Sequence, residues 1–162
     1  MKRWVILALL VALPVAWMAR GAVTPLAPAA SAQARPGAVR FVPVDVYVDT
    51  GSKHLGAYQF ELTAKDATIV GLEGGASPAF ADANYDPAAL QGDRIVVAAF
   101  STDDVLPTGD TRVARLHFVA TGNLDPAKGM PEMTSKLVVA TDADGKTIDA
   151  KLTLRPFQGE KP

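Results

Sequence analysis

The chain contains few residues whose chemistry could drive a reaction. It has no cysteine and only two histidines, His54 and His117, so a thiol nucleophile, a thiolate metal site and a three-histidine metal site are all excluded. A Gly-x-Ser-x-Gly elbow, a phosphate-binding glycine loop and a His-Glu-x-x-His motif are also missing. Asp103 and Asp104 adjoin in one turn-rich segment, whereas glycoside hydrolysis needs two carboxylates held apart across a cleft. The sequence therefore predicts a protein that is not an enzyme and requires no cofactor.

Two acidic segments supply the oxygen ligands that Ca²⁺ prefers. The turn at 142–145 (D-A-D-G) begins like a calcium-binding loop, but Thr153 stands where the twelfth position of such a loop needs an acid. A hairpin turn is the better interpretation of this segment. Asp103, Asp104 and Asp110 form the second acidic group. We predict no metal site, and the residues leave open whether an ion sits in the Asp-rich loops.

The charge balance argues against nucleic acid as a partner. Three of the 16 basic residues precede residue 35, which leaves 13 basic against 17 acidic groups in the rest of the 162-residue chain. Nucleic acids and anionic lipids are bound mainly by clustered lysine and arginine, and no such run is present. The body is long enough to bury a core without disulfides or a metal.

The amino terminus predicts export. Lys2 and Arg3 precede an uncharged apolar run of 16 residues from Trp4 to Ala19, as in a signal peptide. The alternative is an uncleaved anchor helix, although the run is slightly short for a bilayer and Pro14 interrupts it. The body would then be periplasmic, extracellular or anchored to the outer face of the cytoplasmic membrane, with membrane contact only if the segment is uncleaved.

The composition divides the chain into four parts. Residues 1–34 are predicted to be the signal peptide or N-terminal anchor with an Ala/Pro-rich spacer, and 35–38 a linker. Residues 39–157 carry the folded body, and 158–162 a flexible tail.

Apolar residues recur with period two along most of the body, which predicts an all-β protein made of two antiparallel sheets packed face to face. In the run 112–121, for example, Leu116 and Phe118 alternate with Arg115 and His117. The run 95–100 is apolar throughout, as expected for a strand covered on both faces. The predicted strands are 41–50, 54–64, 66–72, 95–100, 112–121, 136–141 and 147–154.

Turn residues between these runs predict three antiparallel pairs. The strands 41–50 and 54–64 are joined by a short turn, 95–100 and 112–121 by a longer one, and 136–141 and 147–154 by D-A-D-G. Pro43 cannot donate a ladder hydrogen bond, so the first strand is expected at a sheet edge or to carry the proline in its first residues. The long connection 73–91 is expected to be functional or to contain a short strand.

The order of these segments resembles the cohesin domain family over about residues 39–155. The similarity lies in L-G-A-Y-Q-F-E-L (55–62), the loop closing on N-Y (84–85), G-D-R-I-V-V-A-A-F (92–100), T-G-D-T-R-V-A-R-L-H-F-V-A (108–120) and A-T-D-A-D-G-K-T-I (140–148). Cohesins are jelly-roll sandwiches related to certain cellulose-binding modules, and they bind dockerin modules through one sheet face. The resemblance implies a non-catalytic module that holds a protein partner, which in this family carries a dockerin.

Carbohydrate binding is the alternative function. Sugar-binding sandwiches stack pyranose rings on planar aromatic side chains. Both tryptophans, Trp4 and Trp17, lie in the export segment, and Tyr47 is the aromatic residue predicted to face outward from a strand. A flat aromatic platform for a polysaccharide cannot be assembled from this set.

Polar residues facing away from the predicted core are the candidate partner-binding site. Their mixed charge suits a reversible interface, and Arg115 is the expected anchor because arginine is enriched at binding hot spots. The same residues also suit a solvated sheet face, and both interpretations stay open. The candidates are Gln59, Glu61, Thr63, Arg112, Arg115, His117 and Thr121, with Tyr85 added from the loop, where it could instead pack inward.

Overall fold

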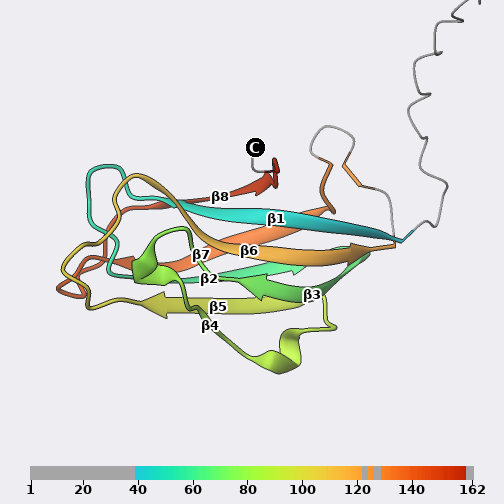
Figure 1. Cartoon of the computed structure of the whole chain (residues 1–162), viewed down its shortest axis with the longest axis horizontal. Coiled ribbons are helices and arrows are strands. Elements are labelled where there is room, and N and C mark those ends of the chain that lie inside the picture. Colours follow the sequence, from blue (N-terminus) through green and yellow to red (C-terminus); the bar gives the residue numbers. More distant parts are fainter. Residues whose placement is uncertain (1–38, 122–123, 126–128, 160–162) are drawn as a thin grey trace, which may run out of the picture. The chain divides into compact units, whose positions relative to one another are not determined.

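The computed structural model describes residues 39–121, 124–125 and 129–159 and shows an all-β sandwich of two four-stranded antiparallel sheets (Figure 1). The first sheet, called sheet A, has the order β3-β6-β1-β8, and the second, sheet B, the order β4-β5-β2-β7. The strands are β1 (Arg40–Asp49), β2 (Ala57–Ala64), β3 (Ala67–Glu73), β4 (Asn84–Tyr85), β5 (Arg94–Phe100), β6 (Asp110–Ala120), β7 (Met133–Thr141) and β8 (Lys151–Pro156). The predicted fold class, a two-sheet antiparallel sandwich, is confirmed.

The predicted signal or anchor helix and the linker that follows it lie outside the described residues, as does the end of the tail. Within the described part, no helix is long and apolar enough to cross a membrane.

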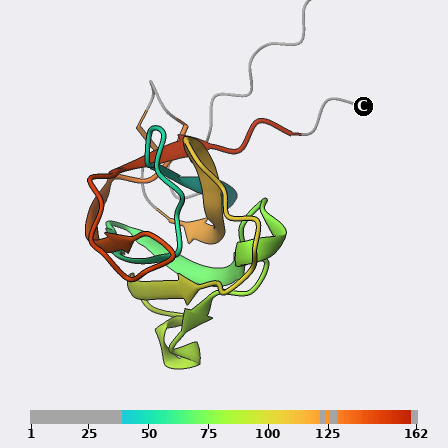
Figure 2. The ribbon, with the colours of Figure 1, turned by 90° about the vertical axis from the view of Figure 1, so that its left-hand side faces the viewer.

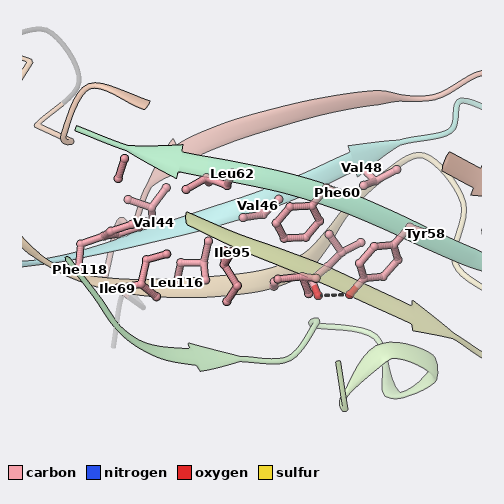
Figure 3. Close-up of a cluster of buried hydrophobic side chains, with 14 of the residues drawn as sticks. Val44, Val46, Val48, Tyr58, Phe60, Leu62, Ile69, Ile95, Leu116 and Phe118 are labelled. Atoms are coloured by element: carbon pink, nitrogen blue, oxygen red, sulfur yellow. Dashed lines mark hydrogen bonds between the residues drawn. The ribbon is translucent and has the colours of Figure 1, made fainter. Parts of the chain in front are cut away.

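The core fills the space between the two sheets with the inward side chains of each strand (Figure 3). Val44, Val46 and Val48 of β1 are completely buried, and so are Phe60 and Leu62 of β2. A single buried side chain of this size stabilises the fold by about 1.5 to 3 kcal/mol. Period-two alternation therefore identified the core residues of these strands correctly.

Strict alternation in the run 112–121 places Val113 on the outward face with Arg115 and His117, but Val113 is fully buried. The pairing of β1 with β6 is irregular between Val46 and Tyr47, whose partners are Ala114 and Arg112, so Val113 has no opposite residue. Such a β-bulge resets the alternation of the strand. The Val113 carbonyl accepts a hydrogen bond of 2.8 Å from the buried hydroxyl of Tyr58 (Figure 3).

All three predicted strand pairs are wrong, because the chain changes sheet where each pair was expected. The strands β1, β3, β6 and β8 lie in sheet A, and β2, β5 and β7 lie in sheet B. Of the sequential neighbours in the described chain, only β4 and β5 pair with each other. The last predicted hairpin survives as a single bridge between Thr141 and Thr147, after which the chain crosses to sheet A. Figure 2 views the two layers from the end that carries these crossings.

β1 is an interior strand between β6 and β8, so the expectation of an edge strand is also wrong. The alternative, a proline among the first residues of the strand, is what the structure shows. β8 pairs with β1 only from Val44 onward, and Pro43 accepts a hydrogen bond from the Phe157 amide just beyond the end of β8. Pro43 therefore stands at the end of the β8 ladder, where a missing donor costs least.

The long connection contains the short strand that its length predicted. Two 3₁₀ turns, η1 (Pro78–Phe80) and η2 (Pro87–Ala89), flank β4. Phe80 is fully buried and its ring lies edge-on to Tyr58 at 5.2 Å between centroids. This contact fixes the connection to the core and brings β4 alongside β5.

Candidate functional site

The outer face of sheet A is crossed by ion pairs between its own strands. Arg115 of β6 contacts Asp45 of β1 through Nε and Oδ1 at 2.7 Å, and its Nη1 lies 3.4 Å from Oε2 of Glu73 on β3. The other oxygen of Glu73 lies 2.7 Å from Nε2 of His117. Arg115, Asp45, Glu73 and His117 are therefore linked across three strands.

The carboxyl-terminal segment adds further contacts to the same face. The guanidinium of Arg115 lies 4.0 Å from the centroid of the Phe157 ring, and that of Arg155 lies 4.1 Å from the centroid of Tyr47. Arg155 also donates two hydrogen bonds, of 2.7 and 3.0 Å, to the carboxylate of Asp110, which raises the pKa of Arg155. The charged groups in the middle of the sheet A face are therefore paired with one another.

The outer face of sheet B has a different character. Its side chains lie in rows across β5, β2 and β7, with Phe100, Ala57 and Thr141 in one row and Ala98, Gln59 and Val139 in the next. Phe100 is 71% exposed, and Val138, at an irregularity of β7, is 47% exposed. The prediction that β5 is covered on both faces is therefore wrong, since one of its faces meets solvent. Apolar and small residues prevail at this end of the face.

One ion pair marks the opposite end of the sheet B face. Nε of Arg94 lies 2.6 Å from Oε1 of Glu61 on the neighbouring strand. The hydrogen bond from Arg94 holds the pKa of Glu61 below its usual value, and the same bond raises the pKa of Arg94. Both groups are exposed, so the pair adds little to the stability of the fold.

Two shallow hollows lie on the sheet B face between its apolar end and the Arg94–Glu61 pair. A hollow of about 450 Å³ is lined by residues that include Gln59, Asn84, Tyr85 and Arg94. A second, of about 250 Å³, is lined by residues that include Ala57, Ala98, Phe100 and Val139. The surface of sheet B is thus gently uneven, with small residues recessed between larger ones, and it suits contact with another macromolecule better than enclosure of a small molecule.

The structure does not bring the sequence-predicted site residues together. Gln59 and Glu61 lie on the outer face of sheet B, whereas Arg112, Arg115 and His117 belong to sheet A. Nη1 of Arg112 donates a 2.9 Å hydrogen bond to the carbonyl of Gly74, which fixes the end of β3. The predicted set therefore mixes residues of two opposite faces.

Tyr85, the loop candidate, lies in β4 and packs partly against the core. Its neighbour Asn84 stands opposite Ala98 and borders both hollows. Sequence reasoning missed Phe100, Val138 and Asn84. For Phe100 a signal existed, because Ile95, Val97 and Ala99 are the buried residues of β5 and the alternate positions had to face outward.

The acidic segment at 142–145 forms a turn, whereas Asp110 of the second acidic group begins β6. Oδ1 of Asp142 accepts hydrogen bonds from the amides of Asp144 and Lys146, at 3.1 and 2.9 Å. Nδ1 of His54 lies 3.1 Å from the carbonyl oxygen of Leu106. Among the residues that the structure describes, no group of three or more His, Asp or Glu side chains is placed to hold a metal ion.

The fold is that of cohesin domains. Similar solved structures include a non-cellulosomal cohesin from the hyperthermophilic archaeon Archaeoglobus fulgidus, with a TM-score of 0.51 and 16% identity over 67% of this chain and 72% of that one. A chain of the CaDoc0917–CaCohA2 complex has a TM-score of 0.52 and 16% identity, over 72% of this chain and 85% of its own. The seventh ScaB type I cohesin from Pseudobacteroides cellulosolvens has a TM-score of 0.50 and 12% identity, over 80% and 88%.

These likenesses define the class of the domain as a cohesin-like jelly-roll sandwich, and at this level of identity they show the fold alone. No model of a protein family matches the sequence, and no curated protein matches it.

Proposed function

We propose that the protein is an exported, non-catalytic binding module that holds a protein partner on the outer face of sheet B. The observation that carries this proposal is the contrast between the two faces. Sheet A exposes Phe41 near the start of β1 but is crossed by its own ion pairs and covered in part by Phe157, whereas sheet B exposes Phe100 and Val138 beside recessed small residues. An exposed aromatic residue on an uneven apolar surface with a polar margin is the usual anatomy of a protein interface.

A dockerin-like module is the partner that the fold favours, since one similar chain was solved as the CaDoc0917–CaCohA2 complex. Within the proposed face, Phe100 acts as the apolar anchor. Gln59 supplies hydrogen bonds, and the Arg94–Glu61 pair forms the charged margin.

The test compares two phenylalanines of similar exposure on opposite faces. Phe100 on sheet B is 71% exposed and Phe41 on sheet A is 78% exposed. We would titrate the Phe100→Ser and Phe41→Ser variants with a panel of dockerin modules by isothermal calorimetry. The proposal expects a dockerin to bind the wild type and the Phe41→Ser variant alike, and Phe100→Ser to bind at least about tenfold more weakly, equivalent to 1.4 kcal/mol. Loss of binding in the Phe41→Ser variant instead would place the interface on sheet A, and a panel without any binder would remove dockerins as the partner.

Polysaccharide binding is less well supported. Phe41, Tyr47 and Phe157 lie on sheet A and Phe100 on sheet B, but the guanidinium groups of Arg155 and Arg115 stack on the rings of Tyr47 and Phe157, so no face of the described domain offers three free aromatic rings. Affinity electrophoresis in cellulose, chitin and xylan gels would detect such binding as a retarded band.

A further inference from the structure

A groove opens between the edge strands β8 and β7, on the side of the sandwich away from β3 and β4. It has a volume of about 620 Å³ and is lined by Lys151–Leu154 along one wall and 130–133 along the other, with Leu124 and Asp125 beside them. Successive side chains of a strand point to opposite faces. Four consecutive lining residues therefore mean that the groove meets the backbone edge of β8.

The hydrogen-bonding pattern shows which backbone groups of β8 face the groove. The Phe157 amide donates to the Pro43 carbonyl at 3.2 Å, so the backbone N–H of Phe157 and the C=O of Pro43 point toward each other between β8 and β1. Because hydrogen-bonded residues alternate in an antiparallel ladder, Arg155 and Thr153 also bond to β1. The N–H and C=O groups of Leu152 and Leu154 then point away from β1, and nothing in the described chain bonds to them.

The opposite side of the sandwich lacks such an edge. There the amide of Ile69 in β3 donates to the Gly92 carbonyl at 2.8 Å, and the Ile69 carbonyl accepts from the Gln91 amide at 2.7 Å. The other edge strand on that side, β4, has only two residues. Exposed edges of this kind are usually blocked because they pair with other chains. The open edges of the described strands therefore lie on the side of β8 and β7, and the groove follows four consecutive residues of β8 but only Met133 of β7.

We propose that the β8 edge accepts an extended segment of a partner protein as an additional strand of sheet A. The free groups of Leu152 and Leu154 are two residues apart, which is the repeat of a β-strand, so an extended backbone pairs with both. Alternate apolar side chains of the segment enter the groove beside Leu152, Leu154 and Met133. Polar or acidic side chains between them lie on the face that carries Lys151 and Arg155. This site is separate from the sheet B face.

A second copy of the chain fits the same edge less well. If two β8 strands paired antiparallel about Thr153, Lys151 of one copy would stand opposite Arg155 of the other. Like charges directly opposite each other destabilise a strand pair. A segment with acidic residues at these positions has no such conflict.

The probe for the experiment is an acetylated and amidated peptide of sequence Thr-Val-Glu-Val-Thr-Val-Glu, titrated into the full folded domain and followed by NMR. Bound peptide is expected to slow hydrogen exchange of the Leu152 and Leu154 amides about tenfold or more. The amides of Thr153 and Arg155 already bond to β1 and should not change. Binding without slower exchange at Leu152 and Leu154, or no binding at all, would overturn the proposal.

A matched pair of variants isolates the backbone donor. Leu152→Pro removes the free backbone N–H of residue 152 and leaves the hydrogen bonds to β1. Leu152→Val introduces a side chain similar in size to proline and keeps the N–H. We expect the peptide to bind Leu152→Val nearly as well as the wild type and Leu152→Pro about tenfold more weakly. Equal affinities would contradict the proposal, and if Leu152→Pro does not fold, the exchange data on the wild type decide.

Two further measurements separate this site from its alternatives. The Phe100→Ser variant should bind the peptide like the wild type, so the sheet B interface and the β8 edge succeed or fail independently. Sedimentation of the wild type without peptide should show a monomer. A dimer in which the Leu152 and Leu154 amides are protected would overturn the proposal, because it would show that a second copy of the chain, and not a segment of a partner protein, pairs with the β8 edge.

Discussion

Arg115 and Asp45 are joined by two contacts across β6 and β1, Nε to Oδ1 at 2.7 Å and Nη2 to Oδ2 at 3.4 Å. Asp45 is only 6% exposed. Replacing Arg115 with alanine would leave this carboxylate without its closest cation, so we expect Arg115→Ala to lower the free energy of unfolding by about 3 kcal/mol. Urea denaturation measures the loss.

The control for this variant is Arg94→Ala, which breaks an exposed pair and should change stability far less. Partner binding per folded molecule should be unaffected by Arg115→Ala. If Arg115→Ala had normal stability but no longer bound the partner, Arg115 would belong to the binding interface.

Because of the buried Tyr58 hydroxyl, the free energy of unfolding should fall at alkaline pH. Burial raises the pKa of Tyr58 above its ordinary value of 10.0. The folded state therefore holds the hydroxyl proton of Tyr58 more tightly than the unfolded chain does. The contribution of this hydroxyl to the free energy of unfolding is complete below pH 10 and declines as the pH rises from there toward the folded pKa. Urea midpoints at pH of about 8 and about 11 should show the decline in the wild type and less of it in Tyr58→Phe.

At neutral pH, Tyr58→Phe should cost about 1 to 3 kcal/mol, because the buried Val113 carbonyl loses its donor. Tyr85→Phe is the control, since its ring is also partly buried. Equal alkaline sensitivity of the wild type and Tyr58→Phe would show that another group is responsible.

The Glu61–Arg94 pair predicts a pKa change that NMR can follow directly. The hydrogen bond from Arg94 lowers the pKa of Glu61, so the pair stabilises the fold above the ordinary glutamate value of 4.5 and this contribution is lost as the pH falls through the lowered pKa. In Arg94→Gln the pKa of Glu61 should rise toward 4.5. Lys65→Gln should leave it in place, because Lys65 pairs with Glu132.

Gly74 occupies a position with no room for a side chain. A Cβ built there would stand 1.7 Å from the Ala81 carbonyl oxygen, whereas one at Gly71 would meet only the His117 ring at 3.6 Å. Gly74→Ala should therefore destabilise the domain by about 3 kcal/mol, and Gly71→Ala much less. Thermal unfolding of the two variants provides the comparison, and equal midpoints would mean that the 74–81 segment shifts without cost.

Burial could be read from the sequence because it depends on residues two apart. Val44, Val46 and Val48 of β1 show the pattern plainly, and Tyr58 and Phe60 of β2 repeat it. The bulge at Val113 could not be read, since an extra residue in one strand is defined only by its partner.

Strand pairing could not be read because the turns that suggested hairpins join opposite sheets, which lie about 10 Å apart. The loops pair with each other instead. The Thr50 amide donates to the Gly109 carbonyl, and the Leu55 amide to the Pro107 carbonyl. Such contacts between distant loops leave no local pattern.

The candidate site suffered from the same limit. Arg115 and Glu61 both face outward, as their strands predicted, but the sequence does not say that their strands belong to different sheets. The apolar end of the sheet B face became visible only when Phe100 of β5 was placed beside Ala57 of β2. Outward direction was predictable, and shared location was not.

The repeated crossing between sheets also governs how the chain acquires its structure. Neither half of the described domain contains all the strands of one layer, because β1 and β8, the first and last of the described strands, are hydrogen-bonded neighbours. Ladders that join the beginning of the domain to its end require closure of a long loop before they gain stability, and topologies of this kind fold in milliseconds to seconds rather than microseconds. Sheet A is therefore complete only after β8 has emerged during synthesis.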